Sequence, residues 1–371
     1  LFTLKERAKE DACLPRVEIV DLREELKEGN RSVFSRRLKA LIEERLEKRE
    51  QVMLFINRRG YANFVSCRSC GEAVRCPHCD VTLTLHRDGR MMCHYCGYSI
   101  PQPKKCPVCG SPYIAPFGTG TQKIEAMAAE LFPKARILRM DLDTTSKKGG
   151  HQEILSSFAR GEADILIGTQ MIVKGHDFSK VTLVGALAAD LSLYASDYRC
   201  AEQTFALLTQ AAGRAGRGQL AGKVVIQTYQ PDHYAITCAA AQDYESFYQE
   251  EILYRELSGY PPVAHMLAVQ IYGKEEENVK QLALRLTDVV KSNMDFLSGK
   301  QKEQSNKKIQ VLGPAPANIS KINDIYRYVF YVKHAEYDVL VEVKDRLEET
   351  LRQWQPRQMS IQFDFDPVSV L

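Results

Sequence analysis

Eight of the eleven cysteines of this 371-residue chain fall in one short stretch. They form four Cys-x-x-Cys pairs, at 67/70, 76/79, 93/96 and 106/109, while Cys13, Cys200 and Cys238 lie apart. A structural Zn²⁺ takes four thiolates in a tetrahedron, usually two from each of two tight turns. The N-terminal residues lack the pattern of a secretory signal, and in a reducing compartment clustered cysteines bind metal more often than they form disulfides. We therefore expect zinc rather than a disulfide framework.

The spacing indicates which pairs share an ion. Residues 81–92 alternate like a strand, turn at Asp88-Gly89 and return, which predicts a β-hairpin between the second and third pairs. This favours a nested arrangement over a sequential one, in which the first two pairs would have to meet across only five residues. The expected inner site is Cys76, Cys79, Cys93 and Cys96. The expected outer site is Cys67, Cys70, Cys106 and Cys109.

Three histidines, His78, His86 and His94, lie among these cysteines and are alternative ligands. Eight thiolates already fill two four-coordinate sites, so we favour surface or packing roles for the histidines. No open coordination position is implied, and the zinc should be structural rather than catalytic.

The segments around the cysteines predict the elements that hold them. Apolar, strand-like stretches alternate with stretches whose apolar period is about 3.6 residues. The expected strands are 17–22, 51–56, 135–141, 163–169, 180–190 and 223–229, and the expected helices are 35–50, 121–132, 151–161 and 201–213. This alternation predicts an α/β fold with a doubly wound parallel sheet, into which the cysteine block is inserted.

The last third has a different order. A helical stretch at 235–257 and the breaker Ser258–Pro262 come first, followed by strand, helix, strand, strand, helix and strand. That order predicts a C-terminal α+β domain of the split βαβ type.

Two loops of the α/β part contain residues that suit phosphate binding. Thr169 and Gln170 follow an apolar strand, with Lys174 and Asp177 shortly after, and the carboxyl end of a parallel strand is a common phosphate site. Gln210 precedes a Gly-Arg-Ala-Gly-Arg-Gly run, in which Arg214 and Arg217 would share a helical face and donate to a phosphoryl group. The alternatives are an ordinary surface turn and a helix end with solvated arginines.

Together these two loops resemble motifs V and VI of superfamily 2 helicases. Other segments narrow the resemblance to the primosomal replication-restart helicases, and it spans essentially the whole chain. These segments are the cysteine insertion after Phe55–Tyr61, Arg139–Thr144, Tyr260–Pro262, Leu312–Pro316 and Asp364–Pro367.

The resemblance implies the second RecA-like lobe of an ATP-dependent, 3′-to-5′ DNA helicase, with a two-zinc ribbon insertion and a C-terminal domain like a small ribosomal protein. Arg217, with Arg214 beside it, would be the arginine finger, positioned by Gln210 and Asp177. The first lobe, which holds ATP and Mg²⁺ in that family, would lie upstream, so this chain alone should lack ATPase activity. DNA contacts are expected from Arg58, Arg59, Thr119, Thr121, Thr169, Gln170 and Lys174.

Thr119 and Thr121 belong to the loop Gly118–Lys123, which lacks the Gly-Lys-Ser/Thr ending of a P-loop. We interpret it as a helix N-terminus that binds a DNA phosphate, with a simple N-cap as the alternative.

The expected division of the chain is 1–16 (tail of the preceding lobe), 17–66 with 110–232 (lobe 2), 67–109 (zinc insertion), 233–258 (helical linker) and 259–371 (C-terminal DNA-binding domain). Expected partners are forked DNA and single-strand/duplex junctions, single-stranded-DNA-binding protein, and primosome or helicase-loading proteins. The protein would be a monomer in the bacterial cytoplasm, associated with the nucleoid. Alternatives are a non-enzymatic zinc-ribbon DNA- or partner-binding module and a protein-binding scaffold.

Composition agrees with a soluble globular protein, since 44% of residues are hydrophobic and 26% charged. The net charge of +3 identifies no partner, although it could hide a local basic groove. No run of about 18 apolar residues exists, so we expect no membrane span.

Overall fold

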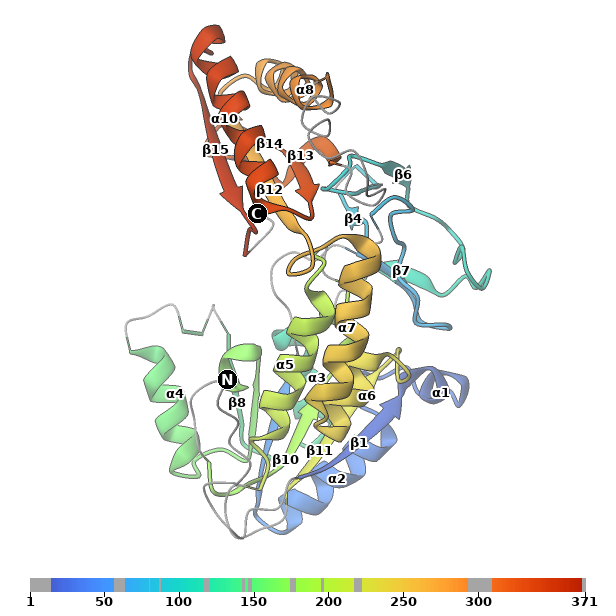
Figure 1. Cartoon of the computed structure of the whole chain (residues 1–371). Coiled ribbons are helices and arrows are strands. Elements are labelled where there is room, and N and C mark those ends of the chain that lie inside the picture. Colours follow the sequence, from blue (N-terminus) through green and yellow to red (C-terminus); the bar gives the residue numbers. More distant parts are fainter. Residues whose placement is uncertain are drawn as a thin grey trace.

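The computed structural model describes residues 15–368 except 57–63, 80, 87, 117–119, 142–143, 146–148, 174–177, 195–196, 217–221 and 293–308. A parallel sheet with its helices forms one end of the molecule, and a cysteine-rich module and an antiparallel sheet domain lie at the other (Figure 1). Among the described helices, none is long and apolar enough to cross a membrane.

The parallel sheet has six strands, as the alternating pattern predicts. They are β1 (Arg16–Asp21), β2 (Gln51–Phe55), β8 (Ile137–Met140), β9 (Ile165–Gly168), β10 (Val181–Ala186) and β11 (Lys223–Thr228). Their order is β1-β11-β10-β2-β9-β8, and every neighbouring pair is parallel. The strands β2, β9 and β10 are buried along their whole length, because helices cover both faces of the sheet.

The helices of this part are α1 (Leu22–Lys27), α2 (Arg36–Glu47), α3 (Thr121–Leu131), α4 (Gly150–Ala159), α5 (Cys200–Ala212), α6 (Tyr234–Ala241) and α7 (Tyr244–Ser258). α2 packs on β2 and β10, and α3 packs on β8 and β9. Right-handed connections place α2 and α3 on one face of the sheet and α4 and α5 on the other. α5, α6 and α7 lie side by side (Figure 1).

Two helical features differ from the sequence prediction. Helix α1 was not expected; Asp21 at the end of β1 starts it by accepting a hydrogen bond from the Arg23 N–H. The predicted helical stretch 235–257 is divided in two, because Gln242 takes a left-handed conformation and Asp243 caps a new helix. α6 packs on β1 and α5, so this stretch belongs to the helical layer of the parallel-sheet domain, hereafter the lobe.

The cysteine-rich module, hereafter the zinc module, follows the carboxyl end of β2. Its strands β4 (Thr84–Leu85), β5 (Arg90–Met92) and β6 (Ser99–Pro101) form a small antiparallel sheet, and the predicted hairpin turn is confirmed at Gly89, which has a φ of +79°. β3 (Val65–Cys67) pairs with β7 (Ile114–Pro116) and closes the module. The paired segment therefore extends a few residues beyond the outermost cysteines on each side.

The C-terminal domain runs β12 (His265–Gly273), α8 (Glu276–Ser292), β13 (Gln310–Ile322), β14 (Ile325–His334), α10 (Tyr337–Trp354) and β15 (Met359–Phe365). Its antiparallel sheet has the order β13-β14-β12-β15, which is the split βαβ arrangement. Along β12, Leu267 and Val269 face the core under α8 and α10, whereas Met266 and Ala268 face the zinc module. The middle of β12 is thus buried on both faces of the sheet.

Candidate metal centres and nucleic-acid site

The structure gathers the eight cysteines into two groups of four. In each group the sulfur atoms all lie within 4.8 Å of one another. One group is Cys76, Cys79, Cys93 and Cys96, and the other is Cys67, Cys70, Cys106 and Cys109. The nested pairing expected from the spacing is therefore confirmed.

The sulfur separations test whether a zinc ion fits. Sγ–Sγ distances are 3.5 Å for Cys76–Cys96, 3.6 Å for Cys70–Cys106 and 3.7 Å for Cys67–Cys109. A tetrahedron with Zn–S bonds of about 2.3 Å has edges of about 3.8 Å. Each group matches a structural Zn²⁺, whose chemistry would be to cross-link two turns of the chain.

The four Cys-x-x-Cys turns, hereafter the first to fourth knuckles in chain order, share one backbone design. The N–H of the first cysteine donates to the carbonyl five residues later, at 2.8 or 2.9 Å, as in Cys67 to Glu72 and Cys106 to Ser111. In three knuckles a glycine follows the second cysteine with φ between +69° and +81°, a conformation that other residues rarely adopt. These glycines are Gly71, Gly97 and Gly110.

The first turn favours the thiolate form of one ligand, Cys67, whereas burial raises the pKa of Cys76 and Cys106. Burial alone would raise the pKa of the Cys67 thiol. Backbone N–H groups of Cys70 and Ser69 and the neighbouring thiols outweigh burial and lower this pKa to about 7. A thiolate, which is the species that binds metal, is accordingly accessible near neutral pH.

The histidines of the module lie outside both groups of four. His94 is buried, and its Nδ1 is 3.0 Å from the Pro316 carbonyl oxygen of β13. Its Nε2 is 3.2 Å from Nε2 of His86. Burial, with a smaller effect of His86, holds the pKa of His94 below its usual range. His94 joins the third knuckle, Cys93–Cys96, to the C-terminal domain.

The first knuckle rests on the lobe at Gly71. The Tyr194 hydroxyl donates to the Gly71 carbonyl, and a Cβ at this glycine would lie 2.1 Å from the Tyr229 carbonyl oxygen. Backbone packs so closely here that no side chain fits. The Cys-x-x-Cys-Gly spacing signals the turn, but nothing in the sequence identifies Tyr229 as its neighbour.

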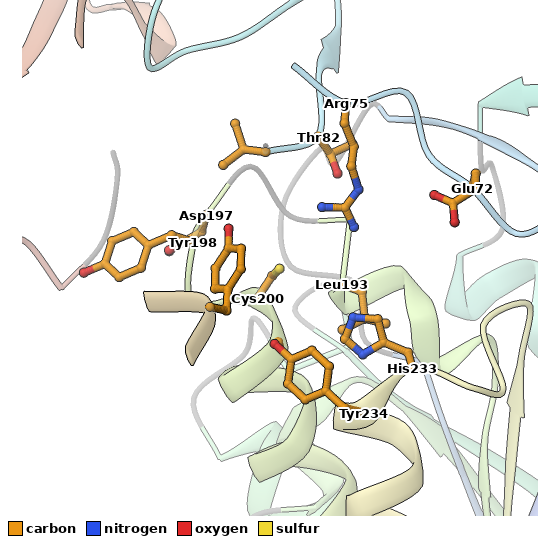
Figure 2. A pocket seen from close by; sticks show the side chains of 12 residues that line it. Glu72, Arg75, Thr82, Leu193, Asp197, Tyr198, Cys200, His233 and Tyr234 are labelled. Atoms are coloured by element: carbon orange, nitrogen blue, oxygen red, sulfur yellow. The ribbon is translucent and has the colours of Figure 1, made fainter. Parts of the chain in front are cut away.

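A cavity of about 320 Å³ lies along the same junction. Arg75 extends from the zinc module toward Cys200 and His233 of the lobe (Figure 2). Burial, with a smaller effect of Arg75, lowers the pKa of His233 to about 4, so its imidazole is neutral at physiological pH. The other lining residues are Glu72, Val81, Thr82, Leu193, Asp197, Tyr198, Ala201, Tyr234 and Tyr254.

The zinc module shares a hydrophobic core with the C-terminal sheet. Tyr95, between two ligands of the inner site, packs against Tyr331 with ring centroids 5.0 Å apart. Tyr260 adds its ring to the cluster, and its hydroxyl is 3.4 Å from the Cys79 carbonyl oxygen. Sequence periodicity predicts that such residues are buried but does not show that they meet.

The candidate DNA-binding loop lies at the carboxyl edge of the parallel sheet. Thr169 directly follows β9, and Gln170 begins the 3₁₀ turn η1 (Gln170–Val173). Nearby, the Thr121 hydroxyl, at the start of α3, donates to Asp141 Oδ2 at 2.6 Å. This hydroxyl is buried and engaged, so a DNA contact here would use backbone N–H groups of the first turn of α3.

The loop that carries the candidate phosphoryl-binding arginine, Arg214, lies toward the amino edge of the parallel sheet. Arg214 Nε donates to the Val173 carbonyl at 2.6 Å, and the Gly216 N–H donates to Val181, the first residue of β10. α5 ends at Ala212, so the expectation that Arg214 lies on a helical face is wrong. After Ala212 the chain continues in tighter turns, in which the Arg214 N–H donates to Ala211 and the Ala215 N–H to Ala212, and Gly216 ends them with a φ of +73°. Gln210 is exposed in the last turn of α5.

Six expected site residues lie outside the described residues: Arg58, Arg59, Thr119, Lys174, Asp177 and Arg217. Among the remainder, the structure brings Arg214 to the end of η1 and gathers Thr121, Thr169 and Gln170 at the carboxyl edge.

Comparison with known proteins gives three matches to family models. They are the helicase conserved C-terminal domain over residues 116–219, the Cys-rich region domain of PriA DNA helicase over 76–101, and the primosomal protein N C-terminal domain over 256–368.

Similar proteins agree with these matches. The replication restart protein PriA of Bacillus subtilis is 44% identical over 373 residues, covering 100% of this chain and 45% of that protein. The Synechocystis protein of that name is 42% identical, covering 96% and 42%, and that of Haemophilus influenzae is 33% identical, covering 96% and 46%. The chain spans about half the length of the curated relatives it matches. It belongs to the PriA family of replication restart proteins.

Proposed function

We propose that the chain is the C-terminal part of an ATP-dependent DNA helicase that acts at stalled or branched replication forks and restarts replication. The observation that best supports this is the position of the two candidate phosphate-binding loops. Thr169 follows the carboxyl end of β9, whereas the Arg214 loop bonds to the amino end of β10. A motor needs separate sites for the DNA backbone and for nucleotide, and one rigid sheet here connects the two.

The residue roles follow from this division. Arg217 is the arginine finger, and Arg214, Gln210 and Asp177 position it. Thr169, Gln170, Lys174, Arg58, Arg59 and the start of α3 with Thr119 and Thr121 contact DNA. ATP and Mg²⁺ bind between this lobe and the lobe that precedes it in the family. The chain by itself therefore lacks ATPase activity, and the complete protein moves in the 3′-to-5′ direction.

The two zinc ions have a structural role, because four cysteines complete each coordination shell. The zinc module then connects the lobe to the C-terminal domain, which binds branched DNA. In the bacterial cell the protein would act as a monomer at the nucleoid, with single-stranded-DNA-binding protein and helicase-loading proteins of the primosome as partners.

The rate of ATP hydrolysis by the complete protein in the presence of forked DNA tests these residue roles. Arg217→Ala should lower kcat for ATP by about 10³–10⁵-fold, the usual effect of losing an arginine finger. Thr169→Ala should raise the DNA concentration needed for half-maximal stimulation and leave kcat at saturating DNA nearly unchanged. Arg160→Ala, at an exposed arginine that caps the C-terminal end of α4, is the matched control and should change neither. Full turnover by Arg217→Ala would exclude the arginine-finger role.

The chain alone provides a second test. It should retard forked DNA at low salt without hydrolysing ATP. DNA-stimulated ATP hydrolysis by this chain would contradict the proposal that ATP binding requires the preceding lobe. Failure to bind any DNA would favour a protein-binding scaffold.

A further inference from the structure

The outermost part of the zinc module is the segment Lys104–Tyr113, which we name the outer knuckle. It contains two ligands of the outer site, Cys106 and Cys109. The connection between β6 and β7, in which it lies, extends away from the rest of the molecule (Figure 1). Its two large hydrophobic side chains are unusually accessible, with Val108 68% exposed and Tyr113 55% exposed.

The exposed Tyr113 ring is carried on a fixed backbone. The Tyr113 carbonyl accepts a hydrogen bond from the Arg68 N–H at 2.9 Å, and its own N–H donates to Ser111 Oγ at 3.1 Å. Ser111 Oγ in turn lies 2.7 Å from Ser69 Oγ of the first knuckle. The next residue, Ile114, pairs with the zinc ligand Cys67. Because the backbone is fixed, only the side-chain torsions of Tyr113 have to be ordered when the ring binds a partner, which keeps the entropy cost of binding low.

The segment that carries this ring is basic in sequence. Lys104 and Lys105 are both exposed, immediately before Cys106. No aspartate or glutamate occurs between Arg90 and Ile124, whereas the whole chain is nearly balanced with 50 basic and 47 acidic residues. The outer knuckle therefore carries two exposed lysines, an exposed aromatic ring and an exposed aliphatic side chain without an acidic residue, which complements a polyanion that also has flat apolar faces.

Single-stranded DNA has those properties. Its phosphates attract lysines, and its unpaired bases stack on exposed aromatic rings. Duplex DNA offers no such free faces along its length. We propose that the outer knuckle contacts single-stranded DNA, with Tyr113 stacked on an unpaired base and Lys104 and Lys105 on the adjacent phosphates. This inference rests on the proposed function, since it requires that the chain bind DNA.

Binding of the zinc-loaded chain to a fluorescent oligothymidylate, followed by anisotropy, tests the stacking. Tyr113→Leu should weaken binding about 5- to 150-fold, the range for loss of one base-stacking contact, and Tyr113→Phe should stay close to the unmodified chain. Tyr244→Leu is the matched control, because Tyr244 is 59% exposed but lies on α7, and it should bind normally. All variants should retain their zinc, which shows that folding of the module is not the cause.

Two further measurements separate the contribution of the two lysines from that of the Tyr113 ring. Replacing Lys104 and Lys105 together by alanine should reduce the slope of log affinity against log salt by about 1.4, the value for two single-strand phosphates. An oligonucleotide carrying 5-iododeoxyuridine should cross-link to Tyr113 under ultraviolet light, as located by mass spectrometry.

The outcomes distinguish this inference from the proposed function. If the chain binds DNA but Tyr113→Leu binds equally well and cross-links lie elsewhere, the stacking proposal is overturned and the proposed function stands. If the chain binds no DNA, both fall. If the lysine variant loses binding to an acidic peptide and not to DNA, the surface is a protein-docking site instead.

Discussion

The ring of Tyr198 lies parallel to the ring of Tyr260, with centroids 4.5 Å apart and 3° between their planes. Tyr198 precedes α5 in the lobe, and Tyr260 leads into the C-terminal domain. The Tyr260 hydroxyl also contacts the Cys79 carbonyl of the second knuckle, Cys76–Cys79, which belongs to the inner metal site. A single stacked pair thus connects three parts of the chain.

Removing the Tyr260 ring should weaken this connection. The side chain is only 2% exposed, so we expect Tyr260→Ala to lower the free energy of unfolding by about 3–5 kcal/mol in urea titrations. The C-terminal domain should also become more accessible to protease. Tyr244→Ala, at an exposed ring, should change stability by no more than about 0.5 kcal/mol. Equal effects of the two substitutions would contradict the importance of the stack.

A buried ion pair lies beside the stack. The Arg255 side chain is 4% exposed and donates to Glu251 Oε1 at 2.6 Å and to the Pro261 carbonyl at 2.7 Å. Arg255→Met leaves the Glu251 charge uncompensated and should cost about 3–5 kcal/mol. The double change with Glu251→Gln should be less destabilising, because the charge is removed while an acceptor for the Tyr234 hydroxyl remains. A double-mutant cycle measures this, and additive losses would argue against coupling.

The two metal sites should respond differently to loss of one ligand. Atomic absorption should find two zinc ions per chain, and either Cys93→Ser or Cys109→Ser should reduce this to about one. Cys93 is buried in the core shared with the C-terminal sheet, whereas Cys109 is exposed. Only Cys93→Ser should therefore increase proteolysis of the C-terminal domain. Equal proteolysis of both variants would contradict docking through the third knuckle.

Gly71 and Gly89 form a natural pair for testing how the zinc module contacts the lobe. Both have positive φ, +81° and +79°, so alanine strains both similarly. A Cβ at Gly71 would lie 2.1 Å from the Tyr229 carbonyl oxygen, whereas a Cβ at Gly89 meets nothing within 4 Å. Gly89→Ala should cost about 1 kcal/mol, the left-handed strain alone, and Gly71→Ala distinctly more. Urea unfolding measures both, and similar losses would show that the contact is not tight.

His233 predicts a pH dependence of stability. Its pKa is about 4 in the folded chain, against about 6.5 for an unperturbed histidine. The unfolded chain binds more protons between these values, so this contribution to stability is lost as pH falls from about 6.5 to 4, at up to about 1.4 kcal/mol per pH unit.

The variant His233→Asn isolates this effect. Asparagine can still cap α6, where His233 Nδ1 accepts the Ala235 N–H. As pH falls from about 6.5 to 4, the unmodified chain should lose stability relative to the variant, as measured by urea unfolding at several pH values. Zinc loss in acid affects both proteins alike, so parallel curves would contradict the assignment.

Local patterns predicted much of this structure. Strand and helix periods gave the parallel sheet and the split βαβ order, and the hairpin at Asp88-Gly89 gave the correct nesting of the metal sites. Each of these depends on residues that are close in sequence. The position of Arg214 was mispredicted, because helical spacing continues through Gly213 in the sequence although the helix ends at Ala212.

Contacts between distant segments were not predictable in the same way. Tyr95, Tyr198 and Tyr260 belong to three separate parts of the chain, and each pattern shows only that an aromatic residue is present. The same is true of Gly71 against Tyr229. These contacts depend on how completed elements pack together, which neither periodicity nor ligand spacing encodes.

The nesting of the two metal sites also sets an order of assembly. The inner cross-link joins Cys76 to Cys96, 20 residues apart, whereas the outer joins Cys67 to Cys109, 42 apart. Once the inner ion has closed its loop, the chain left for the outer ion to close is much shorter, which lowers the entropy lost in closing it. During synthesis the inner ion can be captured before Cys106 and Cys109 have been made. Metal exchange should follow the reverse order, with the outer ion leaving first and the inner ion retained.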